Sequence, residues 1–101
     1  MIMMKKLSNE EIETHLAGGP LEGWKLVNGK LHREYEFEDF VHAFGFMATS
    51  AIAIEAMNHH PEWFNVWNKV VIDLMTHDSG GVTQKDIDLA RKLEGFAAKL
   101  R

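Results

Sequence analysis

Two adjacent histidines, His59 and His60, precede Pro61 in the segment NHHPEWFNVW, which covers residues 58–67. A third, His77, follows an apolar stretch that we expect to be a strand. Each of the three lies where a regular element is expected to pass into a loop, and functional side chains are often found on loops held by a rigid scaffold. The three imidazoles could bind a metal ion, transfer protons or fill space.

A shared metal site is the least favoured of these roles. Three histidines with an open fourth position can hold catalytic zinc. However, Pro61 disfavours a helical conformation at His60, and adjacent side chains of an extended segment point in opposite directions. The sequence also lacks the HExxH spacing of zinc proteases. We therefore expect no metal at this site.

Proton transfer fits the same residues. A free imidazole has a pKa of about 6.5, so its neutral and protonated forms are both available near neutral pH. A reaction that removes a proton from one atom and expels hydroxide from the next needs a base and an acid together. Two or three histidines around a flat substrate could supply both, although the residues alone leave a structural role open.

Several neighbours could support such a site. Trp24, Trp63 and Trp67 could stack against a flat ring, or pack in the core or an interface. Asp78 could orient an imidazole or bind N–H groups of a ligand, or form an Asx turn. Glu55, one helical turn before His59, could tune that histidine or simply be exposed. The other histidines (His15, His32 and His42) fall on ordinary helix or strand surface and are interpreted as solvated or incidental.

Composition restricts the class of protein. The chain has 101 residues, which predicts a single domain over residues 1–101. Its formal net charge is −4 and its basic residues are scattered, which argues against a nucleic-acid partner. It has no cysteine, as suits a reducing compartment. The start is not a signal peptide, and no apolar run approaches a bilayer-spanning length. We expect a cytoplasmic protein with no membrane association.

The periodicity of apolar residues predicts an α+β fold. Helices are expected at residues 9–17, 39–57 and after a capping box that begins at Thr83. Strands are expected at residues 24–27 and 30–37, joined by an Asn28-Gly29 hairpin turn. Residues 64–76 form either one strand or two strands divided at Asn68-Lys69. This order predicts an antiparallel sheet with helices packed on one face.

Two features of these elements are unusual. The helix at residues 39–57 carries apolar residues on more than one face. This indicates that it contacts both its own sheet and another subunit. Arg33 falls on the apolar side of its strand, so we expect it near a sheet edge or a partner. Self-association is therefore expected.

Residues 55–86, EAMNHHPEWFNVWNKVVIDLMTHDSGGVTQKD, strongly resemble the pterin-4a-carbinolamine dehydratase family. That family has an HHPEW-type segment, a strand pair and then a THD-x-x-G-[LV]-[ST]-x-x-D segment. Gly23-Trp24 and the run FEDFVHAFGFM at residues 37–47 are also similar to the family. The likeness covers about residues 7–96, and the combination of motifs in fixed order is specific, whereas HHP alone would not be.

The resemblance implies a metal-free dehydratase, a hydro-lyase, that acts on 4a-hydroxytetrahydropterins. It would expel water to give quinonoid dihydropterin, which a separate reductase returns to tetrahydropterin, the cofactor of aromatic amino acid hydroxylases. The pterin is the substrate, and no cofactor is implied. The resemblance also implies the order α-β-β-α-β-β-α, which favours two strands in residues 64–76, and a homodimer or homotetramer.

The catalytic histidines of the family match His59, His60 and His77. We expect His60 and His77 to be the leading acid–base pair and His59 to assist orientation, although the sequence does not assign acid and base. The implied substrate-binding residues are Asn58, His59, His60, Met75, Thr76, His77 and Asp78, with Glu55, Trp63 and Trp24 as possible support.

This chain departs from the family at a few positions. Asn58 stands where many members carry an acidic residue, and an amide raises the pKa of neighbouring imidazoles less than a carboxylate does. Trp67 and Val71 replace the Tyr and His of the animal proteins. These changes bear on rate and stereopreference more than on reaction type. The alternative to an enzyme is a non-catalytic, oligomeric, coactivator-like interaction module that keeps the fold.

Overall fold

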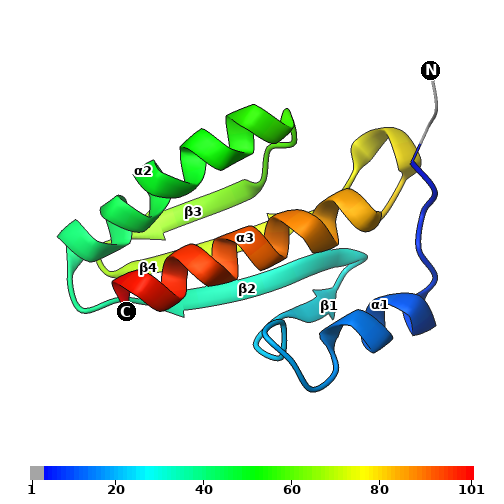
Figure 1. Cartoon of the computed structure of the whole chain (residues 1–101), viewed down its shortest axis with the longest axis horizontal. Helices are drawn as coiled ribbons and strands as arrows, with labels where there is room; N and C mark the ends of the chain where they lie inside the picture. The colour runs from blue at the N-terminus through cyan, green and yellow to red at the C-terminus, as the bar shows by residue number, and fades with distance from the viewer. Residues whose placement is uncertain (1–3) are drawn as a thin grey trace.

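The structure, a computed structural model, describes residues 4–101 and has the predicted order of elements (Figure 1). Helix α1 covers Asn9–Leu16, α2 covers Phe40–Met57 and α3 covers Gln84–Leu100. The strands are β1 Lys25–Val27, β2 Lys30–Glu36, β3 Glu62–Val66 and β4 Lys69–Leu74, and a short 3-10 helix, η1, covers His77–Ser79. The α+β prediction with the order α-β-β-α-β-β-α is confirmed.

The four strands form one antiparallel sheet in the order β1-β2-β4-β3. The apolar stretch at residues 64–76 is divided, as the two-strand alternative required, but the turn lies at Trp67 and Asn68, one residue earlier than expected. Trp67 adopts a positive φ of 48° there. β3 also begins two residues before the predicted strand, so Glu62 follows Pro61 directly into the sheet.

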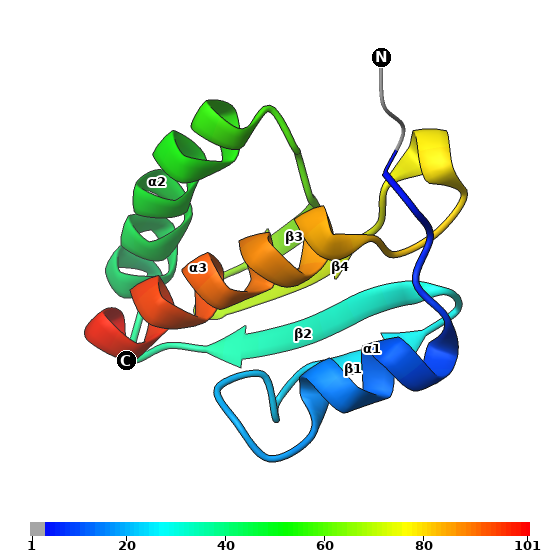
Figure 2. The ribbon, with the colours of Figure 1, turned by 45° about the vertical axis from the view of Figure 1, so that its right-hand side comes forward.

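Helices α2 and α3 lie side by side across one face of the sheet (Figures 1 and 2). The core between the sheet and these helices is mainly apolar, with Leu31 and Tyr35 of β2 buried together with Phe46 of α2 and Leu93 of α3. Helix α1 adds two buried side chains to the same core. The opposite face of the sheet has no helix over it among the described residues.

The helices begin where their capping residues predict. Ser8 and Glu11 form a reciprocal capping box at the start of α1, and Thr83 and Asp86 form another at α3. At α2, the Asp39 side chain caps the helix by accepting a hydrogen bond from the backbone N–H of His42. The cap of α3 also matters for the site described below.

Helix α2 leaves much of its apolar surface uncovered. Phe40, Val41, Phe44 and Ile52 are all exposed, with Ile52 77% accessible. By length and apolar composition α2 also qualifies as a candidate membrane span, contrary to the expectation that no run approaches that length. This is weak evidence, because core helices of soluble proteins qualify as well, and α2 buries Ala43, Phe46 and Ile54 in the core.

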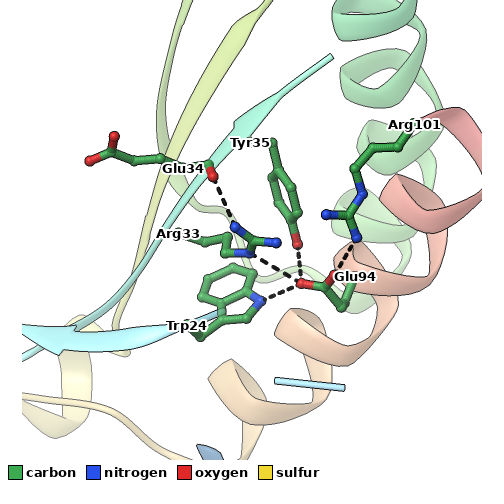
Figure 3. A network of polar contacts seen from close by, with 6 residues as sticks. All are labelled: Trp24, Arg33, Glu34, Tyr35, Glu94 and Arg101. Carbon is green, nitrogen blue, oxygen red and sulfur yellow. Dashed lines mark hydrogen bonds and ion pairs between the residues drawn. The ribbon is translucent and has the colours of Figure 1, made fainter. Parts of the chain in front are cut away.

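Contacts within the chain explain why Arg33 lies on the apolar side of its strand. Its Nε donates to Oε1 of Glu94 on α3 at 3.3 Å, and that oxygen also accepts bonds from the Trp24 indole at 3.1 Å and the Tyr35 hydroxyl at 2.6 Å (Figure 3). Arg101 donates to Oε2 at 2.9 Å. Burial and the bond to Glu94 raise the pKa of Tyr35 well above its usual value. One carboxylate therefore ties the end of α3 to β2.

Candidate active site

A pocket of about 470 Å³ lies beside η1, among the residues that follow α2, the residues that follow β4 and the start of α3. Its lining contains every substrate-binding residue predicted from the sequence, together with one that was not: Asn58, His59, His60, Met75, Thr76, His77, Asp78 and Lys85. Two segments that are separated by about 15 residues of hairpin thus form one concave site.

The end of α2 separates the two adjacent histidines. Asn58 ends the helix in the left-handed conformation, with φ 49°, which Asn tolerates better than most residues. The His59 N–H still donates to Ile54, whereas Pro61 continues into β3. His59 is consequently turned into the protein and His60 outward, as expected for neighbours in an extended segment.

His59 is held by a buried carboxylate. Its Nε2 lies 2.5 Å from Oδ1 of Asp86, which is fully buried. The other oxygen of Asp86 accepts hydrogen bonds from the Thr76 hydroxyl at 2.8 Å and the Thr83 N–H at 2.9 Å. Because an ionised carboxylate can only accept, Nε2 of His59 carries the proton in this bond, so in the neutral ring Nδ1 is the proton acceptor.

His60 and His77 are much more accessible. Nε2 of His60 lies 2.9 Å from Oε1 of Glu55, and the two side chains are 57% and 80% exposed. Glu55 therefore pairs with His60 and not with His59, the partner suggested from helical spacing. His77, in η1, is 71% exposed, and its Nε2 lies 3.6 Å from Oε2 of Glu62.

Hydrogen bonds at both ends hold the loop that carries His77. Thr76 pairs with Gly81 across the loop, with Thr76 N–H donating to Gly81 at 2.8 Å. Gly80 closes the turn with φ 72°, a conformation in which a Cβ would be strained. Ser79 donates to the backbone carbonyl of Met4 at 2.6 Å. Asp78 lines the pocket but makes no hydrogen bond to His77 within residues 4–101.

Comparisons with known proteins agree with this geometry. The sequence pattern of the family described as Pterin 4 alpha carbinolamine dehydratase matches residues 5–96. The chain belongs to this family. A Solibacter usitatus protein with the provisional name pterin-4-alpha-carbinolamine dehydratase is 59% identical over 96 residues, covering 95% of this chain and 99% of that protein. A Burkholderia cenocepacia protein with the same provisional name is 51% identical, covering 95% and 94%.

A crystal structure of a dehydratase-family relative supports the assignment. The Brucella melitensis protein, described as a transcriptional coactivator/pterin dehydratase, superimposes with a TM-score of 0.86 at 43% identity. The match covers 92% of this chain and 99% of that one. Both the sequence motifs and the fold therefore place this chain among the dehydratases.

The tryptophans of this dehydratase-family chain do not line the pocket. Trp24 is buried 98% and donates to Glu94, outside the pocket lining. Trp63 packs partly buried against the core, and Trp67 is exposed at the β3–β4 turn. Within residues 4–101, none of the three tryptophans considered as a stacking wall (Trp24, Trp63 and Trp67) lines this pocket.

Potential metal ligands gather elsewhere. Among the described residues, Glu38, Asp39 and His42 bring ligand atoms within 4.8 Å of one another at the start of α2. Asp39 and His42 are already engaged in capping that helix. The three pocket histidines instead have separate carboxylate partners, so their geometry is that of three individually oriented imidazoles.

Besides Lys85, sequence reasoning missed the role of Asp86 in the site. It was assigned only to the capping box of α3, and the structure confirms that role while adding the bond to His59. The family motif does end on this aspartate, so a signal was present. Its second role requires the approach of α3 to the end of α2, which local sequence does not reveal.

Proposed function

We propose that this protein dehydrates 4a-hydroxytetrahydropterins to quinonoid dihydropterins. In this reaction a base removes the N5 proton, the C4a–O bond breaks, an N5=C4a double bond forms, and the departing hydroxyl is protonated to water. The observation that carries the proposal is the gathering of His59, His60 and His77 around one pocket in a chain of this family. One elimination can use a neutral and a protonated imidazole together.

Burial supports a division of roles among the histidines. His60 and His77 are the accessible pair and would exchange protons with the substrate. His59 is nearly buried and bonded to Asp86, which suits a residue that orients the pterin. We propose that the chemistry needs no metal or other cofactor, since acid and base are both available as side chains. The product would be returned to tetrahydropterin by a separate reductase, in the cytoplasm.

The decisive experiment is a dehydration assay with and without EDTA. Acceleration that survives the chelator is expected, and its loss would indicate a metal enzyme. His60→Ala and His77→Ala should each lower the rate about 10²–10⁴-fold, the range for general acid–base residues. His15→Ala is the matched control, because His15 lies on α1 and contacts Arg91. Near-native rates in both pocket variants would disprove the assigned roles.

Self-association is part of the proposal. We infer a homodimer or homotetramer from the exposed apolar side chains of α2 (Phe40, Val41, Phe44 and Ile52), since soluble monomers rarely leave a large contiguous apolar patch uncovered. Strand β3 is also an edge strand with Phe64 and Val66 exposed on the helix-free face. Both surfaces are available for contacts between copies.

The second candidate function is a non-catalytic interaction module. It is favoured by the exposed apolar face of α2 and by the coactivator description of the Brucella relative. Titration of a pterin into the protein, followed by tryptophan fluorescence, separates the two functions. Saturable quenching supports the enzyme, whereas no quenching together with tight binding of a partner protein in a pull-down supports the module.

A further inference from the structure

We propose that Glu62 is a positioning residue that holds His77 at the pocket and is itself held by Lys30. The proposal rests on the dehydratase function proposed above. It concerns a carboxylate outside the pocket lining, on the open face of the sheet, to which sequence reasoning gave no role.

The two oxygens of Glu62 have different partners. Oε1 accepts a hydrogen bond from Nζ of Lys30 at 2.7 Å, and Oε2 lies 3.6 Å from Nε2 of His77. The carboxylate thus stands between a permanent cation and an imidazole. The Lys30 hydrogen bond, opposed by slight burial and assisted by the Lys30 and His77 charges, lowers the pKa of Glu62, so the group is ionised near neutral pH.

The backbone fixes this arrangement. Glu62 is the first residue of β3 and pairs with Asp73 of β4, which in turn pairs with His32 of β2. Lys30 begins β2 directly after the hairpin turn and reaches the same row. The Lys30 ammonium offsets the like charges of the cross-strand neighbours Glu62 and Asp73. The charged row on the open face ends in Glu62, with one oxygen turned to His77.

His77 needs such a restraint. Its side chain is 71% exposed on a 3-10 turn, and an exposed ring loses conformational entropy when it must adopt one orientation for catalysis. A carboxylate facing Nε2 favours the rotamer that points this nitrogen toward β3. This restraint acts on the rate of the chemical step more than on substrate affinity.

The test compares Glu62→Gln and Lys30→Met with Glu36→Gln. Glu36 is an exposed carboxylate at the far end of β2, opposite Lys69, so the control has the same change of charge away from His77. Because the pair is partly solvated, Glu62→Gln should lower kcat about two- to fivefold with little change in KM. Lys30→Met should also lower kcat, but by a smaller factor than Glu62→Gln. Glu62→Asp should retain more of the original kcat than Glu62→Gln does.

NMR of the histidine ring resonances provides a readout independent of activity. In Glu62→Gln the His77 signals should shift, whereas in Glu36→Gln they should stay unchanged. The proposal is overturned if Glu62→Gln matches Glu36→Gln in kcat and in the His77 signals. If the unaltered protein does not accelerate dehydration, the proposed function fails, while the NMR comparison still decides whether Glu62 holds His77.

Discussion

Nε2 of His59 lies 2.5 Å from Oδ1 of Asp86, with the two side chains 10% and 0% exposed. Asp86 also caps α3 and accepts a bond from Thr76, just before η1. A single buried carboxylate therefore connects three segments: the residues after α2, the residues after β4 and the start of α3. The stability of the helix cap and the orientation of a pocket histidine depend on the same group.

Asp86→Asn should lower dehydration activity because the amide no longer fixes His59 in one tautomer. We expect a loss of at least about tenfold, with the ~10⁴-fold effect of the equivalent change in a Ser-His-Asp triad as an upper bound. The measurement is kcat with urea unfolding in parallel. Glu11→Gln is the control, since it alters the capping box of α1 without touching the pocket. Equal activity in both variants would contradict the role of Asp86.

Glu94→Ala should destabilise the fold without altering the pocket. The substitution leaves the buried donors of Trp24 and Tyr35 without an acceptor and Arg33 without its anion. We expect a loss of about 2–4 kcal/mol in the free energy of unfolding, measured by urea denaturation. Arg101→Met, which removes the more exposed contact of Glu94, should cost under about 1 kcal/mol. Similar losses in the two variants would refute this ranking.

His32 should make stability depend on pH near neutrality. Hydrogen bonds to Glu34 and then Asp73 raise the pKa of His32 above its usual value, against partial burial. A raised pKa in the folded state gives stabilisation that is complete below about pH 6.5 and is lost as pH rises through the folded pKa. His32, interpreted from the sequence as a solvated or incidental surface residue, lies on the open face of the sheet and is paired there with two carboxylates.

Replacement of His32 by Gln should flatten this dependence. We expect the difference in unfolding free energy between pH 6 and pH 8 to shrink by up to about 1 kcal/mol, a small value because Glu34 is mostly solvated. His15→Gln serves for comparison, since His15 contacts Arg91 and no carboxylate among the described residues. An unchanged pH dependence in the His32 variant would show that the cluster does not contribute.

Phe44→Lys should dissociate the proposed oligomer. Phe44 is 56% exposed on α2 beside Phe40, with ring centroids 5.8 Å apart, so a charge there would be buried in any contact through this face. We expect a smaller mass by light scattering and an unchanged far-UV spectrum. Thr14→Lys adds the same charge to exposed α1 and should leave the mass unaltered. If the unaltered protein is a monomer, the inference of self-association is wrong.

Local rules were sufficient for most of the fold. The capping boxes at Ser8 and Thr83 and the Asn28-Gly29 turn set element boundaries through neighbouring residues, and the structure has them in place. Pro61 separates the helix from the following strand and turns His59 and His60 apart for the same local reason. The motif resemblance supplied the list of pocket residues, all of which line one hollow.

Partners distant in the chain could not be found in this way. Asp86 with His59, Glu62 with His77 and Arg33 with Glu94 are separated by 15 to 61 residues, and the last pair joins a strand to a helix. Periodicity shows which face a side chain occupies, but the element opposite that face depends on how the sheet and helices pack. By itself the sequence determined the elements, the family and the histidines. Tertiary packing decided which carboxylates face His59 and His77, because these contacts exist only once α3 meets the end of α2 and β3 meets η1.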